Sequence, residues 1–180
     1  FSSKGFIKQA DYKSDELLAS LIEKSENGKY PILFDTSPCL YRMKEYMQKA
    51  KKELKIYEPI EFILEHLVDK LNFKKVEDVI TIHTTCSSTK MGLTEKFEKL
   101  AKLCTDNVII PKEVGCCGFA GDRGFTYPEL NKSALRNLKS SLPENCTEGY
   151  STSKTCEIGL SLHSGIEYKS IVYLVDKVTD

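Results

Sequence analysis

This sequence of 180 residues carries no net charge, no long apolar run and no nucleotide-binding glycine motif. Its 26 basic residues balance its 26 acidic residues and are interleaved with them, which argues against a nucleic-acid partner. A membrane helix needs about 20 consecutive apolar residues, and every apolar run here is shorter. Since the chain also lacks a phosphate-binding loop and a nucleophile–base pair, it gives no support to a nucleotide-dependent or hydrolytic enzyme.

Cysteine is present in an odd number, seven, so the thiols cannot all be paired in disulfides within one chain. Their spacing also differs from that of small secreted disulfide scaffolds. We therefore expect a reduced, cytoplasmic compartment in which the thiols act as ligands or reactive groups. An apolar content of 41% and a charged content of 29% are typical of a globular domain.

Short β-branched segments alternate with helical patterns along the chain. The segments expected to form strands are residues 32–34, 55–57, 79–82, 108–110 and 146–150, with amphipathic helices between and after them. Ser14 is expected to cap the first helix. This alternation predicts an α/β fold in which a parallel sheet is flanked by helices on both faces.

The most distinctive segment is the loop GCCGFAGDRGF at residues 115–125, which contains the adjacent Cys116 and Cys117. Glycine allows positive φ angles and close approach of other groups to the backbone. Two thiols on such a loop suggest presentation to a metal ion or cluster. A buried, inert pair is the alternative, and a vicinal disulfide ranks lower because its geometry is strained.

Three further cysteines, Cys39, Cys86 and Cys156, also follow an expected strand and precede an expected helix. In an open parallel sheet such loops share one rim, beyond the carboxyl ends of the strands, where ligands bind. We therefore expect the sulfur atoms of Cys86, Cys156 and the loop pair to lie close together.

The remaining thiols and the histidines fit structural roles better. Cys104 lies on an apolar helix stripe and is expected in the core, and Cys146 is interpreted as structural. His66 and His163 fall on helices. His83 lies three residues before a rim cysteine, so it is the histidine that could join a site, with packing as the equal alternative.

The two ends of the chain contain a repeated pattern. A basic–Gly–Phe motif, a helix, a strand and a Thr/Ser-x-x-Cys motif lead to Cys39 in one case and to Cys156 in the other, and each half closes on Tyr-x-x-Ile. The pattern predicts two pseudo-repeated halves within one compact domain, residues 1–70 and residues 71–180. We expect the first half to be truncated at its N-terminus, upstream of Phe1, and the second to be complete.

Three motifs carry a family resemblance: DTSPC at 35–39, CCGFAGDRGF at 116–125 and YSTSKTCEIG at 150–159. Through them the chain resembles the cysteine-rich, or CCG, domain of FAD-linked D-lactate dehydrogenases, glycolate oxidase iron–sulfur subunits and heterodisulfide reductase B subunits. The resemblance covers nearly the whole chain and is closest to the large D-lactate dehydrogenases. Thr36 and Ser153 stand where heterodisulfide reductase has the first cysteine of each closing Cys-x-x-Cys motif.

The resemblance implies an electron-transfer domain of an oxidoreductase that oxidises D-lactate or a related 2-hydroxy acid. Oxidation would occur at FAD in an upstream domain absent from this chain. The implied partners are flavin and ferredoxin-like domains of the same polypeptide and an electron acceptor at the inner face of the membrane. A domain of this kind is not expected to be active alone.

Thiolates suit either iron–sulfur centres or zinc. The expected metal ligands are Cys39, Cys86, Cys116, Cys117 and Cys156. Two neighbouring irons could share the adjacent cysteines, whereas one small ion is awkward for both to chelate. Arg123, and Lys4 in the first half, would offset the negative charge of the cofactor. A zinc site with His83, a structural or docking module, and an unmetallated thiol–disulfide reductase remain alternatives.

Overall fold

The computed structural model describes residues 1–180, apart from the side chain of Ser3. The fold is α/β, as the alternating pattern predicts. Four parallel strands form a sheet in the order β4-β3-β5-β6, and a separate pair, β1 and β2, is also parallel. The strands are β1 (Ile32–Leu33), β2 (Ile56–Tyr57), β3 (Val79–Ile82), β4 (Val108–Ile109), β5 (Cys146–Ser151) and β6 (Glu167–Ser170).

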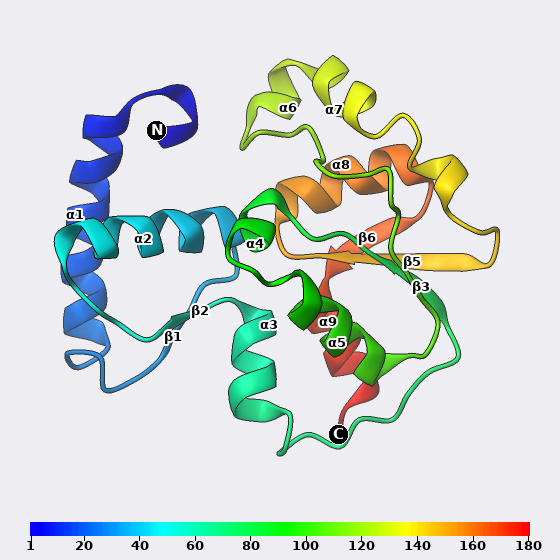
Figure 1. Ribbon diagram of the computed structural model, residues 1–180, viewed down its shortest axis with the longest axis horizontal. Helices are drawn as coiled ribbons and strands as arrows, with labels where there is room; N and C mark the ends of the chain where they lie inside the picture. The colour runs from blue at the N-terminus through cyan, green and yellow to red at the C-terminus, as the bar shows by residue number, and fades with distance from the viewer.

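Helices cover both faces of the four-stranded sheet (Figure 1). The first part of the chain contains η1 (Ser2–Lys4), α1 (Ile7–Lys24), α2 (Ser37–Ala50), α3 (Pro59–Phe62) and the π-helical turn η2 (Ile63–Leu67). The rest contains α4 (Cys86–Lys90), α5 (Thr94–Cys104), α6 (Arg123–Thr126), α7 (Pro128–Ala134), η3 (Lys139–Ser141), α8 (Lys154–Ser164) and α9 (Ile171–Val178). None of the helices in the described chain combines the length and the apolar character that crossing a membrane requires.

Three apolar clusters make up the core. The largest joins Ile80 and Ile82 of β3 to residues of α5 and α9, including Phe97 and Leu174. A second cluster surrounds Leu160 on the face that α7 and α8 cover. The third lies apart from the four-stranded sheet, between α1, α2 and β2. Each face of the sheet thus has its own core, and the N-terminal part of the chain has another.

Two local expectations differ from the structure. The first helix begins at Ile7 rather than near Ser14, and the Ser14 hydroxyl donates a hydrogen bond to the Ala10 carbonyl, 2.8 Å away. A buried serine can satisfy itself in this way inside a helix. Strand β6 was not expected, because its sequence Glu-Tyr-Lys-Ser has no apolar run; its pairing with β5 makes it a strand.

The element order is the same in the two segments that share the repeated pattern. Strand β1, α2, β2 and α3 follow one another as β5, α8, β6 and α9 do, and in each case the two strands pair in parallel. Thr36 is the N-cap residue of α2, and Ser153 is the N-cap residue of α8. That the halves superpose residue by residue stays a prediction.

Candidate thiol site

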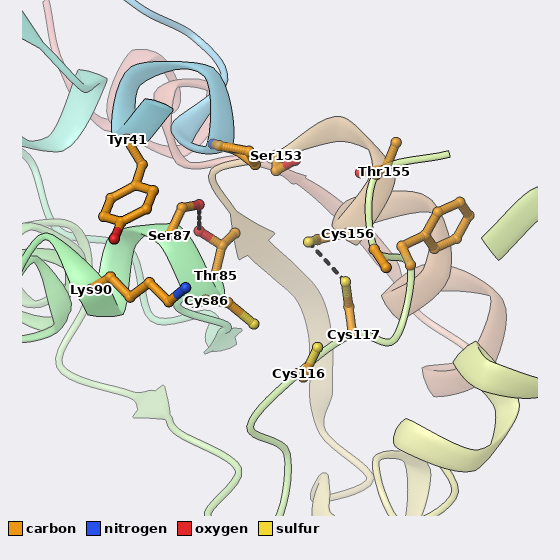
Figure 2. Close-up of a pocket in the computed structure, with 14 residues that line it drawn as sticks. Tyr41, Thr85, Cys86, Ser87, Lys90, Cys116, Cys117, Ser153, Thr155 and Cys156 are labelled. Carbon is orange, nitrogen blue, oxygen red and sulfur yellow. Dashed lines mark hydrogen bonds between the residues drawn. The ribbon is translucent and has the colours of Figure 1, made fainter. Parts of the chain in front are cut away.

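Four cysteines line one cavity at the carboxyl ends of the sheet strands. The cavity has a volume of about 350 Å³, and its walls include Cys86, Cys116, Cys117 and Cys156 (Figure 2). Pro38 and Tyr41 of α2 also contribute to it, as does Lys90 of α4. The site therefore lies where the N-terminal part of the chain meets the four-stranded sheet.

Strand direction explains this convergence. Cys86 is the first residue of α4, directly after β3, and Cys156 is the third residue of α8, directly after β5. Cys116 and Cys117 lie in the loop that leads from β4 to α6. Because β3, β4 and β5 are parallel neighbours, the segments that follow them emerge at the same rim.

The four thiols form a row of neighbours. The Sγ atoms of Cys117 and Cys156 are 2.9 Å apart, and the Cys116 thiol interacts with the thiols of both Cys86 and Cys117. Cys117 and Cys156 are buried, whereas Cys86 and Cys116 are exposed. The row thus runs from solvent at Cys86 into the protein at Cys156.

The surroundings favour the protonated form of Cys86, Cys116 and Cys117. The neighbouring Cys117 thiol and burial raise the pKa of Cys116. The Cys116 thiol lowers the pKa of Cys117. The Cys156 thiol and burial raise that pKa by more, so that the net result is a pKa of about 12. Burial and Cys116 likewise raise the pKa of Cys86, while Lys90 opposes them. A cation that binds here would therefore have to displace protons from the sulfurs.

The donor set has the chemistry of a thiophilic metal centre but not the geometry of a single-ion site. Among the described residues, no group of three or more His, Cys, Asp or Glu side chains is placed to hold one metal ion. Two cysteines on one tetrahedral zinc, with Zn–S bonds of about 2.3 Å, would have sulfurs about 3.8 Å apart. The Cys117–Cys156 separation of 2.9 Å is shorter than that.

Cys39 lies away from the other four expected ligands. It is the third residue of α2 and is exposed, while its neighbours Pro38 and Tyr41 reach the cavity. Helix α2 itself reaches the cavity, so its position after β1 does not exclude Cys39; the Cys39 side chain is not part of the cavity wall. The structure therefore assembles four of the five cysteines.

Lys4 and Arg123 lie together at a different cavity. The Lys4 ammonium is 2.8 Å from the Asp122 carboxylate, and all three residues line a hollow of about 620 Å³ next to α6. The cation beside the thiols is instead Lys90, whose Nζ lies 5.3 Å from the centre of the Tyr41 ring. Its position four residues after Cys86, one helical turn, is a signal that sequence reasoning passed over.

His83 is buried, and hydrogen bonds of its backbone groups hold it in place. Its backbone N–H donates to the Tyr150 carbonyl, and its backbone carbonyl accepts from the Ser151 hydroxyl. Only 4% of the residue is exposed, neither ring nitrogen has a partner among the described residues, and burial lowers its pKa to about 4. The ring is therefore a neutral packing group outside the thiol cavity, so a zinc set that includes His83 is not assembled.

The expected core position of Cys104 is confirmed. Its side chain is buried among Phe97, Leu100 and their neighbours, and its thiol donates to the Leu100 carbonyl. Cys146 begins β5 and is also buried, away from the cavity. Both thiols are therefore part of the folded interior and not of the cavity wall.

Asn131 of α7 anchors the loop that carries Cys116 and Cys117. This residue was not identified from the sequence. It is buried, and its side-chain amide donates a hydrogen bond to the Cys117 carbonyl. Gly118 has a φ angle of 74°, and a Cβ there would lie 2.6 Å from the Leu130 carbonyl oxygen. The loop can therefore pack this closely on α7 only with glycine at position 118.

Comparison with known proteins shows a similarity to a curated protein. The chain is 28% identical over 156 residues to "Lactate utilization protein A 1" of Bacillus mycoides. The match covers 81% of this chain and 64% of that protein, so the chain spans less than two thirds of the relative's length. No protein-family model matches the chain, and no solved structure matches it significantly.

Proposed function

We propose that this chain is the cysteine-rich electron-transfer part of an oxidoreductase that acts on lactate or a related 2-hydroxy acid. The observation that carries the proposal is the convergence on one cavity of four thiols from three separate segments, the start of α4, the loop after β4 and the start of α8. The similarity to a protein named for lactate utilization supports the choice of substrate class.

Cys86, Cys116, Cys117 and Cys156 would hold an iron–sulfur centre, because four thiol donors are what such a centre needs. When bound, the centre supplies one-electron chemistry. The protein's own contribution is to bury Cys117 and Cys156 while leaving Cys86 and Cys116 at the surface, where a partner can approach. Lys90 places a positive charge beside Cys86, which favours its thiolate form.

In this proposal the substrate is oxidised at FAD in another domain of the polypeptide. The thiol site then takes electrons from the flavin, through a ferredoxin-like domain, and delivers them to an acceptor at the inner face of the membrane. No residue of the cavity is assigned to binding the 2-hydroxy acid.

The test is anaerobic reconstitution of the chain with iron and sulfide, followed by metal analysis and electron paramagnetic resonance. Cys117→Ser and Cys156→Ser should lose most of the bound iron and the resonance signal. Cys39→Ser is the matched control, because Cys39 also follows a strand and starts a helix but lies outside the cavity, so it should load like the wild type. Equal iron content in all of these variants would refute the assignment.

A second candidate function, thiol–disulfide exchange, is favoured by the 2.9 Å separation of the Cys117 and Cys156 sulfurs. The two thiols would lose two electrons and two protons as they form a disulfide, and a disulfide substrate would gain them as two thiols. In the same experiment this candidate predicts that wild-type protein binds no iron, yet forms a Cys117–Cys156 disulfide that mass spectrometry detects.

A further inference from the structure

A cluster of buried hydroxyl groups lies behind the thiol cavity. It joins the start of α2, the start of α4 and the residue after β5, so it connects the two-stranded part of the chain to the four-stranded sheet. Its members are Ser37, Thr85, Ser87, Ser88 and Thr152, each no more than 8% exposed. Beyond them lies Glu58, which follows β2 and is fully buried.

The hydroxyls form an unbroken path from the cavity to Glu58. Thr85 and Ser87 line the cavity, and their hydroxyl oxygens are 3.1 Å apart (Figure 2). The Thr85 hydroxyl is 2.8 Å from that of Ser88, and the Ser88 hydroxyl donates to Glu58 Oε1 at 2.8 Å. Every step is within hydrogen-bond distance, and a hydroxyl can accept a proton on one side while it donates one on the other.

Glu58 is a titratable group that the proposed electron transfer does not use. Its Oε2 atom is buried and has no partner among the described residues, and an unpaired buried carboxylate is costly. Burial raises the pKa of Glu58, while hydrogen bonds from Ser88 and Thr152 partly oppose the rise. The charged groups that face it are Glu61, which raises the pKa, and Lys44, which lowers it.

Those two charges largely cancel each other. Glu61 pairs with Lys44 at 3.0 Å and with Lys96 at 3.6 Å. Glu58 is thus left with the hydroxyl cluster as its polar surroundings. The cluster gives it a route to the thiol cavity, where solvent can enter.

We propose that Glu58 exchanges protons with the thiol cavity through Ser88, Thr85 and Ser87, and thereby couples proton uptake to reduction of the thiol site. The coupling rests on the proposed redox function. When the site gains an electron from a one-electron donor such as a reduced flavin, its added negative charge favours protonation of Glu58. A proton from cavity water enters at Ser87, each hydroxyl passes one on, and the carboxylate becomes a carboxylic acid; oxidation reverses every step.

The first experiment needs no cofactor. Infrared spectra of the chain should show the carbonyl band of a buried, protonated carboxyl at mildly acid pH, and Glu58→Gln should abolish that band. After transfer to deuterated water, the band should shift about 100-fold more slowly in the double variant Ser88→Ala/Thr152→Val, because both hydroxyls that bond to Glu58 are then lost. Ser151→Ala is the matched control: Ser151 is as buried as Ser88, but its hydroxyl donates to the His83 carbonyl and not to the path, so its exchange should match the wild type.

The second experiment uses the iron-loaded chain. The reduction potential of the wild-type site should fall with rising pH across the range in which Glu58 titrates, and Glu58→Gln should remove that dependence. Iron-loaded protein in which Glu58→Gln keeps the wild-type pH dependence would overturn the coupling while the proposed function stands. Should the chain bind no iron, the proposed function fails, and the infrared exchange rates decide the proton path by themselves. Equal exchange in wild type and the Ser88→Ala/Thr152→Val variant would refute that path.

Discussion

At the scale of single residues, burial without a partner controls protonation in this protein. His83 and Glu58 both lie inside the fold with ring or carboxylate atoms that have no partner among the described residues. Burial penalises the charged form in each case, so it lowers the pKa of the histidine and raises that of the glutamate. Both side chains are therefore driven toward their neutral forms, and stability must depend on pH.

His83 should make the protein less stable in acid. Its pKa falls from 6.5 in the unfolded chain to about 4 in the fold, so between these values the unfolded chain binds more protons. The stabilisation is complete above pH 6.5 and is lost as the pH falls toward 4; at about 1.36 kcal/mol per pH unit it amounts to roughly 3 kcal/mol. Urea unfolding at pH 5 and pH 7.5 measures the part of this loss that falls above pH 5, about 2 kcal/mol, and His83→Leu should lack most of it.

The control for that experiment is His163→Leu, which changes a half-buried histidine on α8. It should keep the wild-type difference between the two pH values. If His83→Leu loses as much stability on acidification as the wild type, His83 is not the group responsible.

At the scale of elements, α7 determines where the cysteine loop lies. The loop contains no regular structure between β4 and α6, and its close contacts with α7 are the Asn131 bond to the Cys117 carbonyl and the packing of Gly118 on Leu130. Helix α8 supports the same contact, because a Cβ on Gly159 would collide with the Asn131 side chain. Helices α7 and α8 thus hold the loop that carries Cys116 and Cys117. The residues next to these cysteines in the sequence could not position them by themselves.

Removing the Asn131 amide should loosen the loop. Asn131→Ala leaves the Cys117 carbonyl buried without its donor, which should cost about 1–3 kcal/mol of unfolding free energy. We also expect faster alkylation of Cys117, followed by mass spectrometry of the modified peptide. Asn137→Ala is the matched control, since Asn137 donates to Glu113 at an exposed position; unchanged Cys117 reactivity in Asn131→Ala would contradict the anchoring role.

At the scale of the whole molecule, the N-terminal part and the four-stranded sheet have separate cores. The cluster around Met43 and Leu40 lies between α1, α2 and β2, and the strands β1 and β2 are two residues long. The cluster around Leu100 packs against the four-stranded sheet. A small core with short strands should open more readily than the larger one.

Hydrogen exchange should reveal this difference. Met43→Ala should cost about 2–5 kcal/mol of local stability and speed amide exchange in α2, β1 and β2 while leaving β3 and β5 protected. Leu100→Ala, a truncation at an equally buried site in the other core, should speed exchange throughout the sheet. Exchange mass spectrometry distinguishes these patterns, and faster exchange in β3 after Met43→Ala would mean that the whole chain opens as one unit.

The sequence by itself determined the α/β class, the strands β3, β4 and β5, and the rim position of Cys86, Cys116, Cys117 and Cys156. These depend on local hydrophobic periodicity and on strand direction, which neighbouring residues encode. The core position of Cys104 follows from the same periodicity. The start of α1 and the strand β6 do not: Ser14 bonds to Ala10 within its helix instead of capping it, and β6 is a strand because it pairs with β5.

Only the tertiary structure decided which groups surround the thiols. It leaves Cys39 out of the thiol cavity and places Lys4 and Arg123 at another hollow. It also brings Glu58 to Ser88, 30 residues later in the sequence, and so joins Glu58 to the cavity. The physical reason is that these neighbours depend on how the β1–β2 part packs against the four-stranded sheet, and that packing is a sum of long-range contacts that no local pattern records.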